Sequence, residues 1–407
     1  YAGYYIFICK DQQVPDAKFL LFTGDFVETG TEQNSEWEWE QWFEVSMKPL
    51  LSRMALAPTD GNHDDTPNLN YTYHFNTDKT FNETATVKPQ FDGITYSFVY
   101  GDALFMVYSH QDFWRGSYSY ANGTSTYLSN DVANWFRDQV EKYPDTKWRI
   151  AAVHKNLFTG SGHQTDEDGA LFRATLLPVF QELNIDFVIQ GHDHIYEVMG
   201  PINNTTKTIV PGSVTNVELV SPDSNKNPKG QQGGTFNVKD GTLYFVNGTC
   251  GRKRYYPYTQ DEMEAGFDKH KVEGYWDLFT GKYGQPGAPA FSEISVSSSE
   301  IEVKTYTSDA NAQATLFDTF KIVKNGNTGI EENKQSAKLY PTYAKDKINT
   351  TESDIIRVNA IDLTGKIYPL PFDNQHIDVS NLTDGIYVVQ IFTNEKTRSE
   401  RIVKTSR

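Results

Sequence analysis

The segment Asp186-Phe-Val-Ile-Gln-Gly-His-Asp-His194 joins a short apolar run directly to a polar cluster. The run has the length and the bounding residues of a buried β-strand, so the cluster follows the carboxyl end of that strand. Ligands of open α/β sheets collect outside the carboxyl ends of the strands, and we expect similar clusters to converge there. Three more clusters follow strand-like runs: Gly24-Asp25 after Phe19–Thr23, Gly61-Asn62-His63-Asp64 after an apolar stretch and Pro58, and His154-Lys155 after Trp148–Val153.

Helical patterns separate these strands, which is typical of an α/β layered architecture. Three helices are expected: Ser35–Met54, which Pro49 kinks or divides; a helix capped by Ser129, with Val132, Phe136 and Val140 on one face; and Ala170–Leu183. Further strands are expected at Leu104–Tyr108, Thr242–Val246, Ile294–Val296, Ile301–Tyr306 and Leu316–Val323. Residues 254–291 show only weak periodicity, and we interpret them as a long surface insertion.

The side chains of the four clusters indicate which ligand they bind. Asp25, Asn62, His154, His192 and His194 offer carboxylate, amide oxygen and imidazole, a mixture that suits iron, manganese or zinc. Calcium would prefer almost only oxygen ligands, and a structural zinc site would consist mainly of Cys and His at short spacing. Each cluster alone is equally well explained by a turn, a cap or a buried histidine, but all four in this order indicate a metal site.

The composition excludes several other classes of protein. The chain has 407 residues, including 24 Tyr, 25 Phe and 7 Trp, and this apolar area is enough for a packed core. Its formal net charge of -16 argues against a general binder of nucleic acids or anionic membranes. No apolar run approaches the roughly 20 residues that span a bilayer. Cys9 and Cys250 are too few for a disulfide framework; we treat them as separate thiols, with a bridge between them left open.

The clusters also carry a family resemblance. Gly24-Asp-Phe-Val-Glu-Thr-Gly30, Gly61-Asn-His-Asp64, Val153-His154 and Gly191-His-Asp-His194 resemble, in this order, the motifs of the calcineurin-like metallophosphoesterase superfamily, and most closely its purple-acid-phosphatase-like secreted branch. The resemblance covers about residues 15–325. It implies an α/β (α+β) four-layer sandwich, in which two β-sheets are flanked by helices and two metal ions are held at one edge.

The resemblance also implies a role for each residue. Asp25 would bridge two ions, which would be iron, manganese or zinc and would activate a water. Asn62, His154 and His192 would complete the site of one ion, and His194 would bind the other. His63 would donate a proton to the leaving oxygen, with Asp64 holding its ring. His163 would touch the phosphate or be an ordinary loop histidine, and His110 is a candidate behind the site.

The N-terminus departs from the family pattern. Family members open with a strand that ends in an Asp-x-His or Asp-x-Gln motif and gives the first metal a carboxylate. That motif lies some tens of residues before the Gly-Asp motif, whereas only 24 residues precede Asp25 here. Asp11-Gln-Gln13 leaves too little room for the helix that should follow, so we interpret Tyr1–Gln13 as that helix and the opening strand as missing. On this interpretation the chain binds metal poorly or at one site.

A second resemblance lies near the C-terminus. Leu339-Tyr-Pro341, Val358–Gly365, Ile377–Leu382 and Gly385–Val389 resemble the C-terminal sorting domain of type IX secretion, although Thr342-Tyr343 replaces the usual Asn-Pro. The strand signals predict a small all-β sandwich, for which a generic appendage is the alternative. We expect a metallophosphoesterase domain over residues 1–325, a linker over 326–335 and a sorting domain over 336–407. The sorting domain implies a partner, the type IX secretion machinery of a bacterium, and a secreted or cell-surface location.

Together these features predict a secreted, metal-dependent phosphoesterase that acts on small phosphomonoesters, with no nucleic-acid partner and no transmembrane segment. A phosphodiesterase or nucleotide hydrolase is the first alternative, because the metal motifs are shared. A catalytically inactive surface or binding protein on the same fold is the alternative of another class, but the intact clusters at Asn62 and His192 argue against it. Residues 331–407 contain 11 Lys and Arg and 11 Asp and Glu, so the whole negative charge lies in the part that carries the predicted metal site.

Overall fold

The computed structural model describes two separate parts of the chain. They are residues 14–324 and 343–406, except for 15, 31, 33, 65–69, 78–93, 110–125, 205–216, 220–232, 351–353, 363, 365, 374–375 and 394–396. The chain divides into two compact units, Tyr1–Gly326 and Asn327–Arg407, and each is described by itself. The expected helix over Tyr1–Gln13, the expected linker over 326–335, Cys9 and His110 lie outside the described residues.

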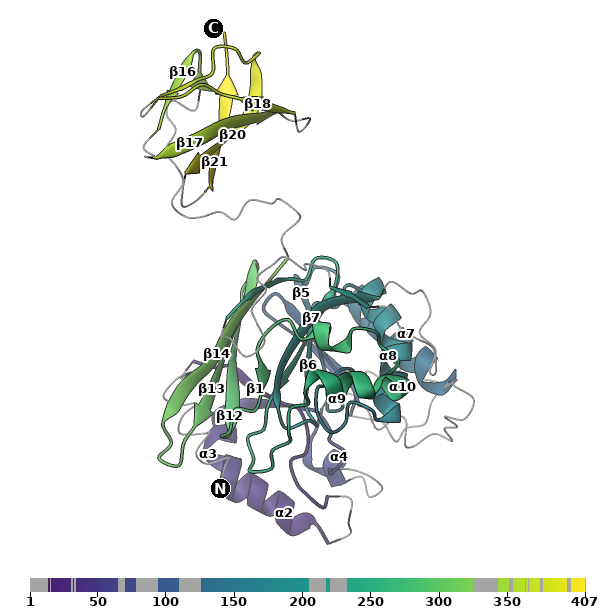
Figure 1. Cartoon of the computed structure of the whole chain (residues 1–407). Coiled ribbons are helices and arrows are strands. Elements are labelled where there is room, and N and C mark those ends of the chain that lie inside the picture. The colour runs from purple at the N-terminus through teal and green to yellow at the C-terminus, as the bar shows by residue number, and fades with distance from the viewer. Residues whose placement is uncertain are drawn as a thin grey trace. The chain divides into compact units, whose positions relative to one another are not determined.

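Two large packed sheets and a separate two-stranded sheet belong to the first unit (Figure 1). The larger sheet has eight strands in the order β11-β7-β10-β6-β5-β4-β3, with β8 paired to β7. Strands β4, β5, β6 and β10 run parallel, as their pairings show, so their carboxyl ends share one edge. The strands are β3 (Tyr96–Tyr100), β4 (Ala103–Val107), β5 (Trp148–Ala152), β6 (Phe187–Gln190), β7 (Tyr196–Asn204), β8 (Val217–Leu219), β10 (Thr242–Asn247) and β11 (Tyr283–Gly284).

The smaller sheet has the order β12-β13-β14-β9. Its strands are β9 (Thr235–Asn237), β12 (Ala290–Val296), β13 (Glu300–Ser308) and β14 (Ala314–Val323). Period-2 alternation places Ile301 and Val303 of β13 in a core shared with Phe187 of the larger sheet. On the opposite face Glu302 pairs with Lys304 at 2.8 Å between carboxylate and ammonium. Among the described residues this outer face is therefore charged, and the helices lie against the larger sheet.

Helices α7 (Thr126–Lys142) and α8 (Glu167–Glu182) cover the other face of the larger sheet. Val132 and Phe136 of α7 are buried there and Val140 packs against them, which confirms the predicted apolar face. Ser129 lies inside α7, which begins at Thr126, so the prediction that Ser129 caps this helix is wrong. The helix extends on the N-terminal side of its apolar face. Two sheets with helices packed on one of them confirm the predicted fold class.

The first helical segment is divided, as Pro49 predicts. It consists of α2 (Glu36–Glu40), the π-helix η1 (Gln41–Met47) and α3 (Lys48–Leu51), with Pro49 in the first turn of α3. Proline removes one helical hydrogen bond, and the wider π-helical turns precede the point where it is missing. The parallel strands β1 (Phe19–Phe22) and β2 (Ala55–Pro58) flank this segment, and α4 (Asn70–His74) follows.

The prediction of a surface insertion over residues 254–291 is wrong. The segment forms α9 (Gln260–Ala265), α10 (Phe267–His270), the 3-10 helix η4 (Tyr275–Leu278) and β11. Met263, Val272, Tyr275, Leu278 and Phe279 are buried in the core that also contains α7 and α8. Helices of four to six residues are too short to display a 3.6-residue period, so the sequence showed no helical pattern here.

The second unit is an all-β domain with its own core. A five-stranded sheet has the order β15-β21-β20-β17-β18, and β16 pairs with β19. Val358, Val389 and Ile402 form the centre of its core. The strands are β15 (Tyr343–Ala344), β16 (Lys347–Asn349), β17 (Ile355–Asp362), β18 (Ile367–Pro369), β19 (His376–Asp378), β20 (Gly385–Thr393) and β21 (Thr397–Lys404).

Candidate metal centre

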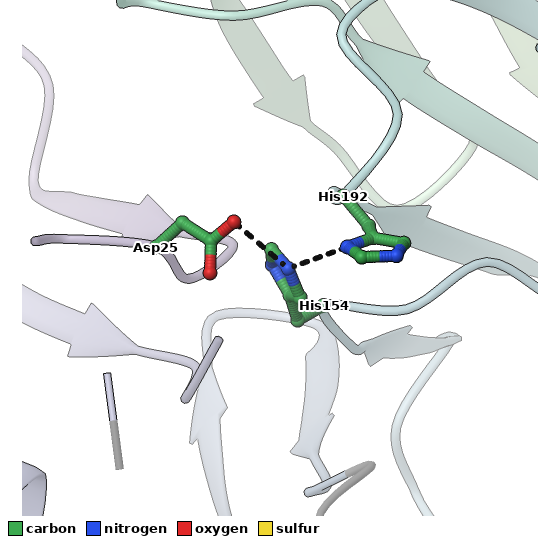
Figure 2. Close-up of side chains that lie close together, drawn as sticks. All are labelled: Asp25, His154 and His192. Carbon is green, nitrogen blue, oxygen red and sulfur yellow. Dashed lines mark hydrogen bonds and ion pairs between the residues drawn. The ribbon is translucent and has the colours of Figure 1, made fainter. Parts of the chain in front are cut away.

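The four polar clusters begin where strands β1, β2, β5 and β6 end. Asp25 follows β1, Asn62 follows β2, His154 follows β5 and His192 follows β6. Strands β1 and β2 are parallel to each other, as are β5 and β6, so each pair delivers its clusters in the same direction. This topology brings residues that are up to 167 positions apart in the sequence into one site (Figure 2).

His154 is the centre of this site, and its side chain is 1% exposed. Its Nε2 atom lies 3.2 Å from Asp25 Oδ2, 3.1 Å from Asn62 Oδ1 and 3.1 Å from His192 Nδ1. In Figure 2 the ring of His154 stands between Asp25 and His192. Four potential ligand atoms therefore converge on one point from four different loops.

This spacing fits a metal ion. Two ligand atoms that each lie about 2.1 Å from a metal are about 3.0–3.4 Å apart at angles of about 90–109°. The Nδ1–H group of His154 donates to the Thr23 carbonyl at 2.6 Å, which leaves the Nε2 lone pair directed at the site. Burial raises the pKa of Asp25, but the charge and hydrogen bonds of His154 and His63 outweigh it and hold that pKa below its usual value. The carboxylate is therefore ready to bind a cation.

The loops approach so closely that glycine is required between them. A Cβ atom on Gly61 would lie 2.1 Å from the backbone nitrogen of Asp25, and one on Gly191 would lie 2.6 Å from the Thr23 carbonyl oxygen. Asp25 and His192 both have left-handed backbone conformations, with φ of 55° and 62°. Such φ values are uncommon for residues other than glycine and recur at functional sites.

Asp64 holds two of these loops together. Its carboxylate accepts hydrogen bonds from the backbone N–H groups of Asp25 at 2.8 Å, Phe26 at 2.7 Å, Val27 at 3.2 Å and Gly61 at 2.7 Å. The residue is fully buried. Burial and the charge of Asp25 raise its pKa, whereas the four N–H donors oppose this because they stabilise the ionised carboxylate. The expectation that Asp64 holds the ring of His63 is wrong, because its oxygens are turned toward the backbone of the neighbouring loop.

The ring of His63 is held by a backbone carbonyl. Its Nδ1 atom lies 2.7 Å from the carbonyl oxygen of Glu28, to which it donates, so Nε2 is the ring atom left to exchange a proton with a substrate. The backbone N–H of His63 donates to Asp25 Oδ1 at 3.1 Å. The histidine is therefore fixed beside the candidate ligands by contacts that its sequence position did not reveal.

His194 stands apart from the four converging ligand atoms. Its Nδ1 atom donates to the Lys253 carbonyl at 3.0 Å, and its ring stacks on Tyr255 with centroids 4.5 Å apart and planes within 5°. Burial lowers its pKa to about 4, so the imidazole is neutral and its Nε2 is available as a ligand. This position is compatible with a second ion beside the first.

His163 also lies at the site, together with a residue that the sequence analysis did not single out. Its ring centroid is 3.8 Å from that of His192, and its Nδ1 atom lies 2.7 Å from Asp166 Oδ2. Asp166 directly precedes α8, where an acidic residue reads as a helix cap, yet its side chain makes no capping bond. Its position three residues after His163 was the only signal of this pairing.

Comparison with known proteins agrees with this geometry. Residues 5–196 match the family model for calcineurin-like phosphoesterases, and residues 338–405 match that for the secretion system C-terminal sorting domain. The chain is thus similar to calcineurin-like phosphoesterases in one region and to a C-terminal sorting domain in a later one. The sorting domain indicates export to the cell surface or secretion. In the described part of the chain no helix has both the length and the apolarity needed to cross a membrane.

The phosphoesterase domain has relatives of greater length. An uncharacterized protein of Mycobacterium tuberculosis is 25% identical over 206 residues, which cover 47% of this chain and 37% of that protein. Purple acid phosphatase 5 of Arabidopsis thaliana is 26% identical over 176 residues, 43% of this chain and 34% of the plant protein. The chain thus spans little more than a third of these relatives. A purple acid phosphatase from yellow lupin seeds shares the fold, with a TM-score of 0.50 and 15% sequence identity. The match covers 80% of this chain and 49% of the lupin protein.

Proposed function

We propose that the chain is a secreted, metal-dependent phosphoesterase that hydrolyses phosphomonoesters. The observation that supports this most directly is the convergence of Asp25, Asn62 and His192 on Nε2 of His154. A carboxylate, an amide oxygen and two imidazoles suit iron, manganese or zinc, and a structural role would not require two strained loop conformations. Similarity to calcineurin-like phosphoesterases agrees with this proposal.

Asp25, Asn62, His154 and His192 would hold one ion, and His194 would hold a second one with Asp25 between them. When bound, such ions lower the pKa of a water and neutralise the charge on phosphoryl oxygens. The described residues offer four ligand atoms at the first position and fewer at the second. We therefore propose one tight and one weak site in this chain, in agreement with the sequence-based expectation.

His63 would act as the general acid. Because Nδ1 is engaged with the Glu28 carbonyl, the proton for the leaving oxygen would come from Nε2. His163, whose ring is held by Asp166, would contact the phosphate from the side of His192. Burial lowers the pKa of His163, but the hydrogen bond and charge of Asp166 outweigh it and raise the pKa, which favours the cationic ring that an anion requires.

The division of labour along the chain is part of the proposal. Residues 1–325 would carry the hydrolase, residues 326–335 would be a linker, and residues 336–407 would engage the type IX secretion machinery. Limited proteolysis should first cut the chain inside 326–335 and leave hydrolase activity in the larger fragment. Loss of activity together with this first cut would contradict the division.

Hydrolysis of p-nitrophenyl phosphate, with bis(p-nitrophenyl) phosphate as the diester, tests the reaction. We expect faster turnover of the monoester and a loss of about 10²–10⁴-fold in kcat for His63→Ala. His376→Ala is the control, because His376 is likewise a partly exposed histidine with a hydrogen-bonded Nδ1 atom, but it lies in the second unit. Preference for the diester would favour the phosphodiesterase alternative, and no hydrolysis in the metal-loaded protein would favour the binding protein.

A further inference from the structure

Residues Arg252–Tyr256, here called the basic loop, stand beside the metal centre. The chain as a whole has a net charge of -16, yet Arg252, Lys253 and Arg254 are three consecutive cations and all three are exposed. Tyr256 is 87% exposed, which is unusual for an aromatic side chain. No role in folding explains these side chains, because exposed cations contribute little to stability.

Hydrogen bonds and ring contacts place the basic loop at the site. The Lys253 carbonyl accepts from His194, and Tyr255 lies against both His194 and His163, with a ring centroid distance of 5.6 Å to the latter. The backbone of Tyr256 accepts from Ser161 at 2.7 Å. The loop is thus fastened to the two segments that carry His194 and His163.

A glutamine fixes the loop from behind. Gln285 Nε2 donates to the carbonyl oxygens of His194, at 2.8 Å, and Tyr255, at 2.9 Å. The position of the basic loop is therefore set by backbone groups, and its cationic side chains remain available for a ligand.

In the part of the chain that the structure describes, no close ion pair neutralises the charges of the loop. No carboxylate of the described residues lies within ion-pair distance of Arg252, Lys253 or Arg254, and Arg254 donates only to the carbonyl of Arg252, at 3.0 Å. The Lys253 ammonium lies 5.6 Å from the centroid of the Tyr255 ring, and that ring stacks on His194, so this charge stands beside the metal centre. The basic loop thus brings cationic residues to the border of the place where a phosphate would be cleaved.

We propose that the basic loop binds a second phosphate group of the substrate, so that organic bisphosphates are preferred over monophosphates. Guanidinium groups match phosphate geometry with paired N–H donors. Without local cations, the strongly negative phosphoesterase domain would repel a substrate that carries two phosphates. The inference deepens the proposed function and rests on it, since the first phosphate is the one that would be hydrolysed at the metal centre.

A matched pair of substrates tests the proposal: fructose 6-phosphate and fructose 1,6-bisphosphate, with phosphate release as the readout. We expect the metal-loaded full chain to have a KM about tenfold lower for the bisphosphate. Arg252→Gln should remove most of this preference through KM, with a smaller change in kcat, and Arg252→Lys should restore part of it. Raising the salt concentration should weaken binding of the bisphosphate more than that of the monophosphate.

Lys239→Gln is the control, because Lys239 is an equally exposed cation in the turn between β9 and β10. It should leave both KM values unchanged. Equal KM values for the two substrates in the unaltered protein, or equal losses on both in Arg252→Gln, would overturn the proposal. If neither sugar phosphate is hydrolysed, the proposed function is wrong. Calorimetric titration of the two sugar phosphates into the protein then tests whether the basic loop binds the second phosphate. Tighter binding of the bisphosphate that Arg252→Gln abolishes would then support the loop's role, and no binding would overturn it.

Discussion

Replacing Asp64 by asparagine tests its role as the anchor of the two loops that carry Asp25 and Asn62. Each carboxylate oxygen of Asp64 accepts two backbone hydrogen bonds: Oδ1 from Phe26 and Val27, and Oδ2 from Asp25 and Gly61. Asparagine has one carbonyl oxygen and one NH₂ group. Whichever way the amide turns, two of the four backbone donors face another donor.

The magnitude follows from these contacts. A buried donor that loses its acceptor costs about 1–3 kcal/mol, so Asp64→Asn should lower the free energy of unfolding by about 2–6 kcal/mol. The two loops that carry Asp25 and Asn62 would also lose their common anchor, so metal affinity should fall with stability. His63→Ala, by contrast, should lower kcat with little effect on unfolding, because His63 contacts only the loop surface.

Denaturant unfolding of the metal-free protein is the assay, with metal titration alongside. Asp309→Asn is the control, because Asp309 Oδ1 accepts from the backbone of Asn311 at 2.9 Å and Gln313 at 2.8 Å in an exposed turn. An amide oxygen can replace this single acceptor, so the cost should stay below about 1 kcal/mol. Unchanged stability of Asp64→Asn would refute the loop-anchoring role.

Three more predictions concern the site and its support. Gly61→Ala should greatly reduce metal affinity, measured by calorimetric titration, because the added Cβ would lie 2.1 Å from the nitrogen of Asp25; binding equal to that of the unaltered chain would contradict this packing. Metal titration should show one tight and one weak site, and Asp25→Asn should weaken both; two equally tight ions would refute the expectation of an incomplete second site. Burial raises the pKa of Asp186 to about 6. Between pH 4 and 6 the folded state therefore keeps a proton that the unfolded state loses. The free energy of unfolding should fall by up to about 3 kcal/mol as the pH rises through that window. In urea unfolding curves recorded at several pH values, Asp186→Asn should flatten the dependence of the free energy of unfolding on pH. An unchanged dependence would mean that other groups cause it.

The sequence predicted the strands and the polar clusters because both are local patterns. An apolar run followed at once by Gly191-His192-Asp193-His194 contains the strand, its end and the ligands in nine residues. The partners of these ligands could not be predicted in the same way. The Glu28 carbonyl that holds His63 is 35 residues away, and the Lys253 carbonyl that holds His194 is 59 residues away.

The segment from Arg254 to Phe291 shows where pattern reading fails. Its helices are one or two turns long, and its buried residues have no regular spacing. A capping box between Thr259 and Glu262 was the one local signal of α9. Tertiary contacts with α8 and β7, not intrinsic periodicity, determine the structure of this segment.

This segment also explains how the loop that bears His163 is held. The hydroxyl of Tyr275 lies 2.9 Å from both the N–H and the carbonyl oxygen of Thr159, and Glu197 Oε2 accepts from the N–H of Gly160 at 2.6 Å. The hydroxyl of Thr159 contacts the carboxyls of both Asp193 and Glu197.

A hydroxyl has one proton, so it can donate to only one of these two carboxyls, and the other must be protonated and donate to the hydroxyl oxygen. Burial raises the pKa of both Asp193 and Glu197, so one of these two acids carries the proton. The loop between His154 and His163 is therefore fastened from behind by a neutral acid, a threonine and a tyrosine. The segment that looked like a surface insertion thus forms the rear support of the candidate metal centre.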